Sequence, residues 1–584
     1  MRVEERTEGG STAGAEYRRQ HWWLAVVLGV TLLTYLPTVA FQFVYDDLGQ
    51  IVANPAVKSA NYIPGYFGGE MWAGVFHGAP GSYYRPLSLL WLLLEFKLFG
   101  LRPWGWHLLS VLLQVAVTGL VYLVARRLVG SVQSAVSAAL LFGVHPVHAE
   151  VGAWISGAPD ALCALLVLAA FLAYLRWHDC GSVRWLGCSL GLYALALLSK
   201  ETAFFLPVLV FAHAWLQCEA RRKWPRMGRA ALAGAPFVPV LLAYLGVRVW
   251  ALHGFSHPQE QISWMAMVLT WPSLLWFYLK HLLLPVGLSE FYDFSYVTGF
   301  GLRAVVLPGL GVLAAILGCL YWARKTESKT VALALVWGIV FLAPALNLRV
   351  FFSWDLAHDR YLYLPSVGFA LLLAIGLQRL DPGKTRWAGW PVGKLAALGL
   401  LTVLYCLGTA YASVFWWNST SLYTRGVQVA PHNPIARNNL GRELLDAGHY
   451  AEAAAAFQQV IQEHPHLWLG YFNLGYMSYQ TGEPETAERY LRQALALYPD
   501  GAGTYAYLGL SELQQGKVAE AERDVRHALA LDPRGAGYHL ALAIVLQQKG
   551  GCAEALPEFR LEEVYHPGNP TVQEHLKACQ QGQP

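Results

Sequence analysis

Two adjacent carboxylates, Asp46 and Asp47, stand a few residues beyond the first long apolar segment of the chain. A membrane helix that ends there would deliver both to a water-facing surface, where a carboxylate can take a proton from a hydroxyl group. They open a polar, aromatic-rich loop, residues 42–103, that precedes the next long apolar segment. The pair is therefore the first candidate for catalytic residues, and capping of an interfacial helix or turn is the structural alternative.

Other ionisable residues fall at the ends of further apolar segments, on the same predicted side as the two aspartates. Such residues are functional candidates, because burial of an ionisable group beside an apolar bundle is costly. The cations suited to an anionic partner such as a phosphate are Arg85, Lys200 and Arg360. Lys200 and Arg360 could equally pair with their neighbours. The polar residues expected to support the site are His145, His148, Glu150, Asp160, Glu201 and Asp359.

The stretch His145-Pro-Val-His148-Ala-Glu150 combines two imidazoles and a carboxylate, the groups that bind transition metals. Each histidine alone is more typical of hydrogen-bonded packing than of metal binding. The spacing fixes neither the helical phase nor a further ligand. We therefore keep His145, His148 and Glu150 as weak candidates for a divalent-metal site, and metal dependence stays open.

The apolarity of the chain is uneven along its 584 residues, of which 55% are hydrophobic and 14% charged. Repeated apolar runs fill residues 22–416, whereas residues 417–584 alternate Ala and Leu with Glu, Gln and Arg, as a soluble helical protein does. We expect an all-α protein with a short tail, residues 1–21, a membrane domain and a soluble domain. A net charge of +4 without a basic, aromatic-interleaved cluster argues against nucleic acid as a partner.

About twenty apolar residues span a bilayer, and short basic loops concentrate on the cytoplasmic side. With a cytoplasmic N-terminus, eleven crossings place the basic loops on one side, and the aspartates with the soluble domain on the other. Residues 264–285 fit an interfacial or re-entrant segment, and residues 85–98 an interfacial helix. The eleven segments are 22–41, 104–125, 132–147, 161–176, 185–199, 203–218, 230–250, 302–321, 331–346, 361–378 and 394–416.

The soluble domain repeats with a period of 34 residues, which is the tetratricopeptide pattern. Leu-Gly pairs such as Leu474-Gly475 keep this step, and bulky residues such as Leu491 follow in phase. Small residues let the two helices of a repeat approach closely, and proline ends the second helix. We expect four full repeats over about residues 434–569, a preceding half repeat and a C-terminal cap. Such an array binds proteins or peptides, or serves only as a scaffold.

Eight cysteines occur without a CxxC pair or a Cys/His ligand spacing. This pattern argues against a zinc site or a disulfide framework. Cys552 and Cys579 could pair, but their separation alone does not decide this. We therefore expect buried thiols.

The motifs resemble, in type and order, those of the transmembrane and tetratricopeptide-repeat-containing O-mannosyltransferases, which belong to the GT-C superfamily. The motifs are Phe43-Val-Tyr-Asp-Asp with Asn54-Pro55, Tyr84-Arg-Pro-Leu, Phe142-Gly-Val-His-Pro-Val-His-Ala-Glu-Val, Ser199-Lys-Glu and Arg360-Tyr-Leu-Tyr-Leu-Pro-Ser-Val-Gly-Phe, followed by the repeats. The chain departs from the family pattern twice. Gly157-Ala158-Pro159-Asp160 stands where Gly-Arg-x-Asp is expected, and Asp359 where Glu is expected.

This resemblance implies a multi-span, inverting glycosyltransferase that moves a mannose-like hexose from a polyprenyl or dolichyl phosphate to Ser or Thr hydroxyls of proteins. Asp46 or Asp47 would be the base, and Arg85, Lys200 and Arg360 would bind the donor phosphate. The site and the repeats would lie outside the cytoplasm, in the periplasm, the extracellular space or the lumen of the endoplasmic reticulum. The alternative is a non-enzymatic, membrane-anchored repeat scaffold, which has no use for cations collected around one cavity.

Overall fold

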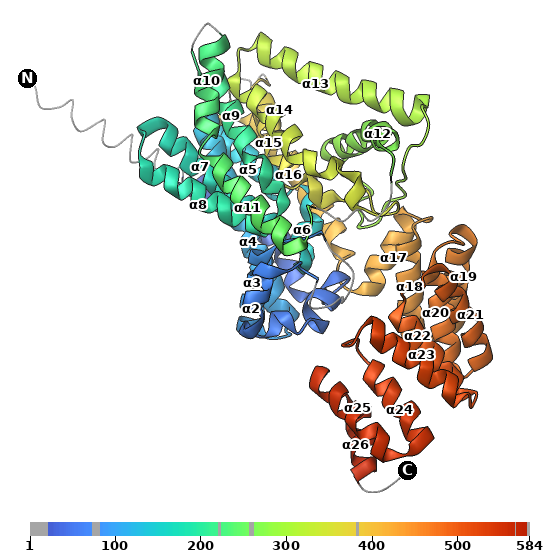
Figure 1. Ribbon diagram of the computed structural model, residues 1–584. Helices are drawn as coiled ribbons and strands as arrows, with labels where there is room; N and C mark the ends of the chain where they lie inside the picture. Colours follow the sequence, from blue (N-terminus) through green and yellow to red (C-terminus); the bar gives the residue numbers. More distant parts are fainter. Residues whose placement is uncertain are drawn as a thin grey trace, which may run out of the picture. The chain divides into compact units, whose positions relative to one another are not determined.

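The computed structural model describes residues 21–72, 82–219, 223–255, 262–380, 385–566 and 568–580. The predicted tail, residues 1–21, lies outside this range except for His21. The described chain is almost entirely helical and divides into two compact units, with the boundary between Arg425 and Gly426. Figure 1 shows the helices of both units along the sequence.

Six helices in the described residues are long and apolar enough to cross a membrane. A seventh would be the pair α10 (Lys223–Gly234) and α11 (Phe237–Leu252), if these two helices, bent by 49° at their junction, form one span. The chain is therefore a multi-pass membrane protein by helix length and composition. The six are His21–Ala40, Pro103–Val129, Ile155–Cys180, Leu302–Lys325, Lys329–Leu346 and Val392–Val414.

This number is lower than the eleven crossings expected, because several apolar runs are not single helices. Proline lacks an amide donor and disfavours helical geometry in the residue before it. Accordingly, the α-helix in the run at 132–147 ends at Gly143, ahead of Pro146. In the runs at 203–218 and 361–378, new α-helices begin at Leu206, just before Pro207, and at Pro365. The resulting helices have 12, 12 and 13 residues, too short for an ordinary span.

The remaining helices of the first unit are shorter or amphipathic. The interfacial helix expected at residues 85–98 corresponds to α3, Pro86–Phe99, a helix of 14 residues. Residues 264–285 contain α12, Trp264–Leu283, with Pro272 inside it. Two strands of two residues, β1 (Arg386–Trp387) and β2 (Trp390–Pro391), pair antiparallel. After the first helix, which lies within His21–Ala40, the described helices of this unit are α2 Ile63–Gly68, α3 Pro86–Phe99, α4 Pro103–Val129, α5 Val132–Gly143, α6 Ala149–Ala153, α7 Ala158–Cys180, α8 Val183–Ser199, α9 Leu206–Gln217, α10 Lys223–Gly234, α11 Phe237–Leu252, α12 Trp264–Leu283, α13 Leu307–Lys325, α14 Lys329–Leu342, α15 Pro365–Leu377 and α16 Val392–Val414, with α17 Ser419–Val429 at the boundary.

The core of the first unit is built from α4, α5, α7, α8, α14 and α15. Large rings fill it: Phe171 on α7 contacts Trp337 on α14 edge to face, with ring centroids 5.3 Å apart. Among the six long helices, Ile155–Cys180, which contains α7, is the most enclosed. In its most apolar stretch, 72% of the residues are buried. The turn that carries Trp154 and Ser156 immediately precedes α7, and Asp160 lies in the first turn of α7.

The second unit consists of four successive helix pairs, as the 34-residue period predicted (Figure 1). A Cβ added at Gly475 would lie 2.7 Å from the side chain of Leu491, so close approach of the paired helices requires glycine there. Leu491 itself is fully buried. The pairs are α18 Pro434–Asp446 with α19 Tyr450–Glu463, α20 Trp468–Gln480 with α21 Pro484–Leu497, α22 Ala502–Gln514 with α23 Val518–Leu531, and α24 Tyr538–Gly550 with α25 Cys552–Tyr565, followed by α26 Pro570–Gln580.

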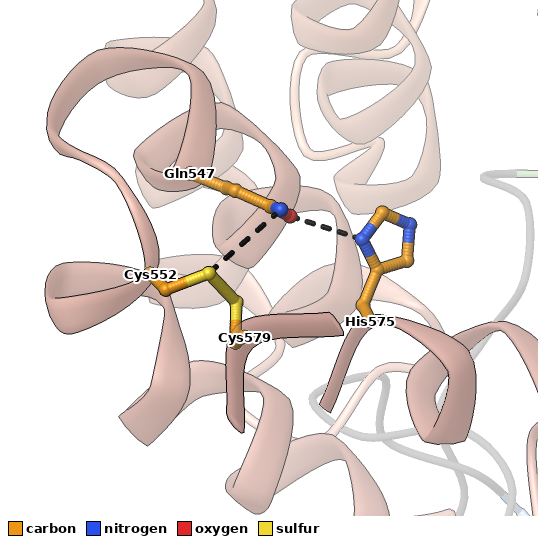
Figure 2. Close-up of a disulfide and its surroundings, with 4 residues drawn as sticks. All are labelled: Gln547, Cys552, His575 and Cys579. Atoms are coloured by element: carbon orange, nitrogen blue, oxygen red, sulfur yellow. Dashed lines mark hydrogen bonds between the residues drawn. A yellow bond between two sulfur atoms is a disulfide. The ribbon is translucent and has the colours of Figure 1, made fainter. Parts of the chain in front are cut away.

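The expectation of free thiols is wrong for two cysteines, because Cys552 and Cys579 form a disulfide. It joins the start of α25 to the end of α26, as Figure 2 shows. Beside it the Gln547 side chain is hydrogen-bonded to His575, at 2.9 Å. Helix folding brings together two residues that lie 27 positions apart, which sequence separation alone could not establish. The other six cysteines are free, but the expectation that they are buried holds only for Cys163: Cys180 and Cys188 are exposed, and Cys218, Cys319 and Cys406 are partly buried.

Candidate functional site

The aspartate pair lies on the turn that follows the first long helix. That helix ends in a short 3-10 segment, Leu36–Ala40, whose proline at its start breaks the regular helix. Residue Tyr45 then adopts a left-handed backbone, with φ of 56°. This conformation is uncommon for a residue other than glycine, and such strain is concentrated at functional sites. The turn ends at Asp47, which precedes the helical turn Leu48–Ala53.

The two carboxylates have different surroundings. Asp47 is fully buried, and its Oδ1 accepts hydrogen bonds from the backbone N–H (2.8 Å) and hydroxyl (2.6 Å) of Ser156. Its Oδ2 accepts one from the Val44 backbone N–H at 3.1 Å. Asp46 is half-buried, and no group in the described residues donates a hydrogen bond to it. Asp46 is thus the more exposed carboxylate of the pair, whereas the Asp47 side chain is hydrogen-bonded within the fold.

The three predicted phosphate-binding cations line a single cavity of about 270 Å³ in the first unit. Arg85 precedes α3, Lys200 follows α8, and Arg360 lies in the helical turn Asp359–Leu362. A fourth cation, Arg248 of α11, lines the same cavity. The remaining wall is mostly apolar and includes Phe204, Phe205, Phe255, Phe341, Ala343, Pro344, Ala345, Val350, Phe351 and Leu364.

Carboxylates hold these cations in place. Glu201 accepts from Arg85 Nη2 at 2.8 Å and from Arg248 Nη1 at 3.0 Å, so it lies between two guanidinium groups. Burial raises the pKa of Glu201, but the charges of the two arginines outweigh burial and bring the pKa to about 2. Lys200 Nζ pairs with Asp160, another lining residue. Glu201 and Asp160 were expected to support the site, and the structure brings both to it.

Arg360 is the centre of a buried charged cluster. Its Nη1 contacts both Glu150 and Glu290, the latter at 2.9 Å. His358 contacts Glu290 at 3.4 Å and Asp355 at 3.2 Å. Burial raises the pKa of Glu150, whereas the charges of Arg360 and His358 overcome burial at Glu290 and lower its pKa. The two carboxyl groups that contact Arg360 therefore differ in acidity, and Glu290 is the stronger acid.

Asp46 belongs to the same electrostatic environment. Burial raises the pKa of Asp46 to about 7, with a further rise from the negative charge of Glu290 and an opposing effect from Arg360. An ordinary aspartic acid has a pKa of about 3.9. A carboxylate with a pKa near neutral is a stronger base than an ordinary one, which suits proton abstraction from a hydroxyl group.

The two candidate metal-binding histidines do not join Glu150. His145 Nε2 lies 3.1 Å from the Leu282 carbonyl, and His148 Nε2 lies 2.8 Å from the Ser366 hydroxyl. The one group of three potential ligands found among the described residues is Glu150, Glu290 and His358. The Arg360 guanidinium already contacts both of those carboxylates and supplies the positive charge there.

Asp359 faces away from Arg360, its neighbour in sequence. Its carboxylate accepts from the Tyr292 hydroxyl at 2.5 Å and lies 3.0 Å from His281 of α12. Asp359 therefore ties the turn that carries Arg360 to the segment after α12.

Sequence reasoning missed Arg248 and Glu290. Arg248 is a lone cation within the apolar helix α11, a signal of a functional residue that could have identified it. Glu290 lies in a loop rich in acids and aromatics, Ser289-Glu-Phe-Tyr-Asp-Phe, where nothing in the local pattern distinguishes it. Only the fold brings Glu290 to Arg360.

Comparison with protein families gives two matches. A model described as dolichyl-phosphate-mannose-protein mannosyltransferase matches residues 84–243, which contain Arg85, Lys200 and Glu201. A tetratricopeptide-repeat model matches residues 438–502 and 508–570, in agreement with the four helix pairs.

Individual relatives agree with these matches. Protein O-mannosyl-transferase TMTC1 of Homo sapiens is 28% identical over 75% of this chain and 54% of its own length. Protein O-mannosyl-transferase F38B6.6 of Caenorhabditis elegans is 26% identical over 75% of this chain and 62% of its own. The chain thus spans little more than half the length of the curated relatives it matches.

Among solved structures, the thermophilic TPR protein TTC0263 of Thermus thermophilus matches 32% of this chain and 96% of its own, at 23% identity and a TM-score of 0.26. The motif order, the two family models and the two curated relatives agree on one assignment. The chain is similar to the transmembrane and tetratricopeptide-repeat-containing O-mannosyltransferases, with a match to the mannosyltransferase model in the membrane region followed by repeats.

Proposed function

We propose that this chain transfers a mannose-like hexose from a polyprenyl or dolichyl phosphate to Ser or Thr hydroxyls of proteins, with inversion, on the non-cytoplasmic side of a membrane. The observation that carries the proposal is the cavity that collects Arg85, Lys200, Arg248 and Arg360. Asp46 is not among the residues that line this cavity, but Arg360, which lines it, lowers the pKa of Asp46, and this supports a common site for the cations and the carboxylate.

The cavity suits a lipid phosphate in charge and in polarity. Its lining carries four cations and the carboxylates of Asp160 and Glu201, and Arg360 also pairs with Glu150 and Glu290 behind the lining. A phosphate group in the cavity would accept hydrogen bonds from the lining cations. Its apolar wall suits an isoprenoid tail, since burial of apolar surface is favourable. Nucleotide sugars are cytoplasmic, so a site on the other side requires a donor that the membrane itself delivers.

In the reaction, the acceptor oxygen would attack the anomeric carbon from the face opposite the phosphate. Asp46 would take the hydroxyl proton as the new carbon–oxygen bond forms. The bond between the anomeric carbon and the phosphate oxygen would break, and its electron pair would leave with the lipid phosphate. Arg85, Lys200 and Arg360 would stabilise the departing negative charge.

The disulfide supports the proposed sidedness. Disulfides persist in oxidising compartments, whereas cytoplasmic thiols are kept reduced. The Cys552–Cys579 bond therefore favours a location of the repeats outside the cytoplasm. The multi-span GT-C architecture and the cytoplasmic N-terminus remain part of the proposal, with the repeats binding the protein acceptor.

The collected cations favour a transferase over a non-enzymatic scaffold. A scaffold would tolerate these charges scattered over separate helices. In the structure the four cations come from different helices and turns and line one cavity. Each of them has a carboxylate partner. Burial of so many charges is costly and is typical of functional sites.

The test is mannosyl transfer by the purified full-length chain in nanodiscs, with a short-chain polyprenyl phosphate mannose and a Ser/Thr-rich peptide. Asp46→Asn should lower kcat by about 10²-fold or more without a change in Tm, because the amide cannot accept the proton. The matched control is Asp293→Asn, which removes an exposed carboxylate on another loop. Full activity of Asp46→Asn would contradict the base assignment, and absence of any transfer by the parent chain would contradict the function.

A further inference from the structure

One short turn holds the residues on both sides of Asp46. This turn, Trp154–Gly157, connects α6 to α7. Its Ser156 donates two hydrogen bonds to Asp47, at 2.8 and 2.6 Å. Its Trp154 ring contacts the Tyr45 ring, with centroids 5.8 Å apart. The neighbour before Asp46 and the neighbour after it are therefore both attached to the same four residues.

The contact between the Tyr45 and Trp154 rings stabilises an unfavourable backbone conformation at Tyr45. A tyrosine at φ of 56° needs surrounding contacts to persist, because the left-handed region is disfavoured for residues with a side chain. Three rings supply them: Trp154 at 5.8 Å, Phe291 at 5.7 Å and Tyr423 at 6.4 Å from the Tyr45 ring. The strained turn is thus fixed by aromatic packing on one side and by the Asp47 carboxylate on the other.

The same turn also contacts the cation of the charged cluster. The Arg360 guanidinium lies over the Trp154 ring, 5.3 Å from its centroid. The Trp154 ring in turn stacks on Trp416, at 5.6 Å and 22°. Trp154 is buried, so these contacts are shielded from water. The turn therefore fixes both the loop that carries Asp46 and the arginine that acts on it.

From these contacts we infer that the turn Trp154–Gly157 is the positioning element of the active site, with Ser156 as a positioning residue for Asp46. This inference rests on the proposed function of Asp46 as the base. Asp47 then acts as the anchor of the loop and takes no proton from the acceptor. The Asp46 side chain, which has no hydrogen bond of its own among the described residues, keeps its place only through its two neighbours.

Loss of this attachment should slow the chemical step and leave donor binding intact. Ser156→Ala removes the 2.6 Å hydroxyl hydrogen bond and keeps the one from the backbone. A displacement of about 1 Å at a catalytic group can cost about 10²-fold in rate. We expect kcat to fall by about ten- to a hundredfold, with the KM for the donor within about twofold of the parent value. Ser156→Thr, which retains the hydroxyl, should restore most of the rate.

The control is Ser189→Ala, which removes another buried serine hydroxyl whose hydrogen bond, to the Ala170 carbonyl, lies within the helix bundle. It should leave kcat unchanged. If Ser156→Ala does not fold, Tyr45→Asn replaces it, because asparagine tolerates the left-handed backbone but removes the ring. The same loss of kcat is expected there.

The decisive measurement combines Ser156→Ala with Asp46→Asn. A residue that acts through Asp46 should have no further effect on the residual rate once Asp46 cannot accept a proton. An unchanged kcat in Ser156→Ala, or an equal loss in the Asp46→Asn background, would overturn the inference and leave the proposed function intact. Full activity of Asp46→Asn would instead contradict the proposed base.

Discussion

The pH profile of the reaction should depend on the charge of Glu290. Burial raises the pKa of Asp46 to about 7, and among neighbouring charges Glu290 contributes most to this rise. A general base must be ionised, so kcat/KM should rise with pH and level off above about pH 7. Below that value the ionised fraction falls about tenfold per pH unit, so about a tenth of the plateau rate remains at about pH 6.

Glu290→Gln removes this negative charge while it preserves the size of the side chain. It also leaves Arg360 without one of its partners, and a less neutralised arginine lowers the pKa of Asp46 further. A fall of about one pKa unit corresponds to about 1.4 kcal/mol. The acid limb of the profile, which is the pH range where kcat/KM rises with pH, should then move to about pH 6. At that pH the variant would retain about half of its plateau rate.

The assay is kcat/KM for mannosyl transfer by the full-length chain between about pH 5 and about pH 9, a range that brackets the expected pKa. Asp293→Asn is the matched control, because this exposed carboxylate lies on the same loop as Glu290. Its acid limb should coincide with that of the parent. An acid limb that stays in place, or moves to higher pH, in Glu290→Gln would refute the electrostatic reasoning.

Three further predictions concern the cavity, the disulfide and the repeats. Arg85→Gln should raise the KM for the donor about tenfold or more, because a hydrogen bond to a charged group contributes about 1.5–3 kcal/mol. The control is Lys97→Gln, an exposed cation on α3, the helix that Arg85 precedes, and it should leave this KM unchanged. Cys552→Ser should lower the free energy of unfolding of the last repeat by about 3–4 kcal/mol in urea titrations. A reducing agent should lower this free energy in the parent chain and leave it unchanged in the variant. Gly475→Ala should lower the Tm, at a cost of about 1–3 kcal/mol, since the added Cβ would lie 2.7 Å from a buried leucine. Gly191→Ala, where a Cβ meets nothing within 4 Å, should leave the Tm unchanged or raised.

The repeat region could be predicted from the sequence because its structure is set by local rules. Each glycine that permits close approach is followed at a fixed interval by the bulky residue that it contacts. Gly441 with Phe457, Gly475 with Leu491, and Gly509 with Val525 repeat the same contact, at 2.6, 2.7 and 2.6 Å from an ideal Cβ. The disulfide escaped prediction because it depends on how α26 folds back on α25.

The residue types of the site could be predicted, but not their pairing. Arg85, Lys200 and Arg360 could be selected because cations beside apolar segments are rare. That Glu201 pairs with Arg85 and not with Lys200, its neighbour in sequence, depends on the packing of α3 against α8. The predicted number of eleven membrane crossings was too high for a related reason. Hydropathy measures the length of an apolar run, whereas prolines such as Pro207 decide where the helix within that run begins.

The pairing of the cations bears on the ligand that the cavity can accept. Four unpaired cations in an apolar bundle would be costly, so Asp160, Glu201 and Glu290 stabilise them in fixed positions. Fixed donors need no reorganisation when a negative charge develops beside them. Arg360 lines the cavity, and its partners Glu150 and Glu290 lie outside the lining. The pairs that make the cations tolerable in the bundle therefore also hold them beside the cavity, where a phosphate group would accept hydrogen bonds from them.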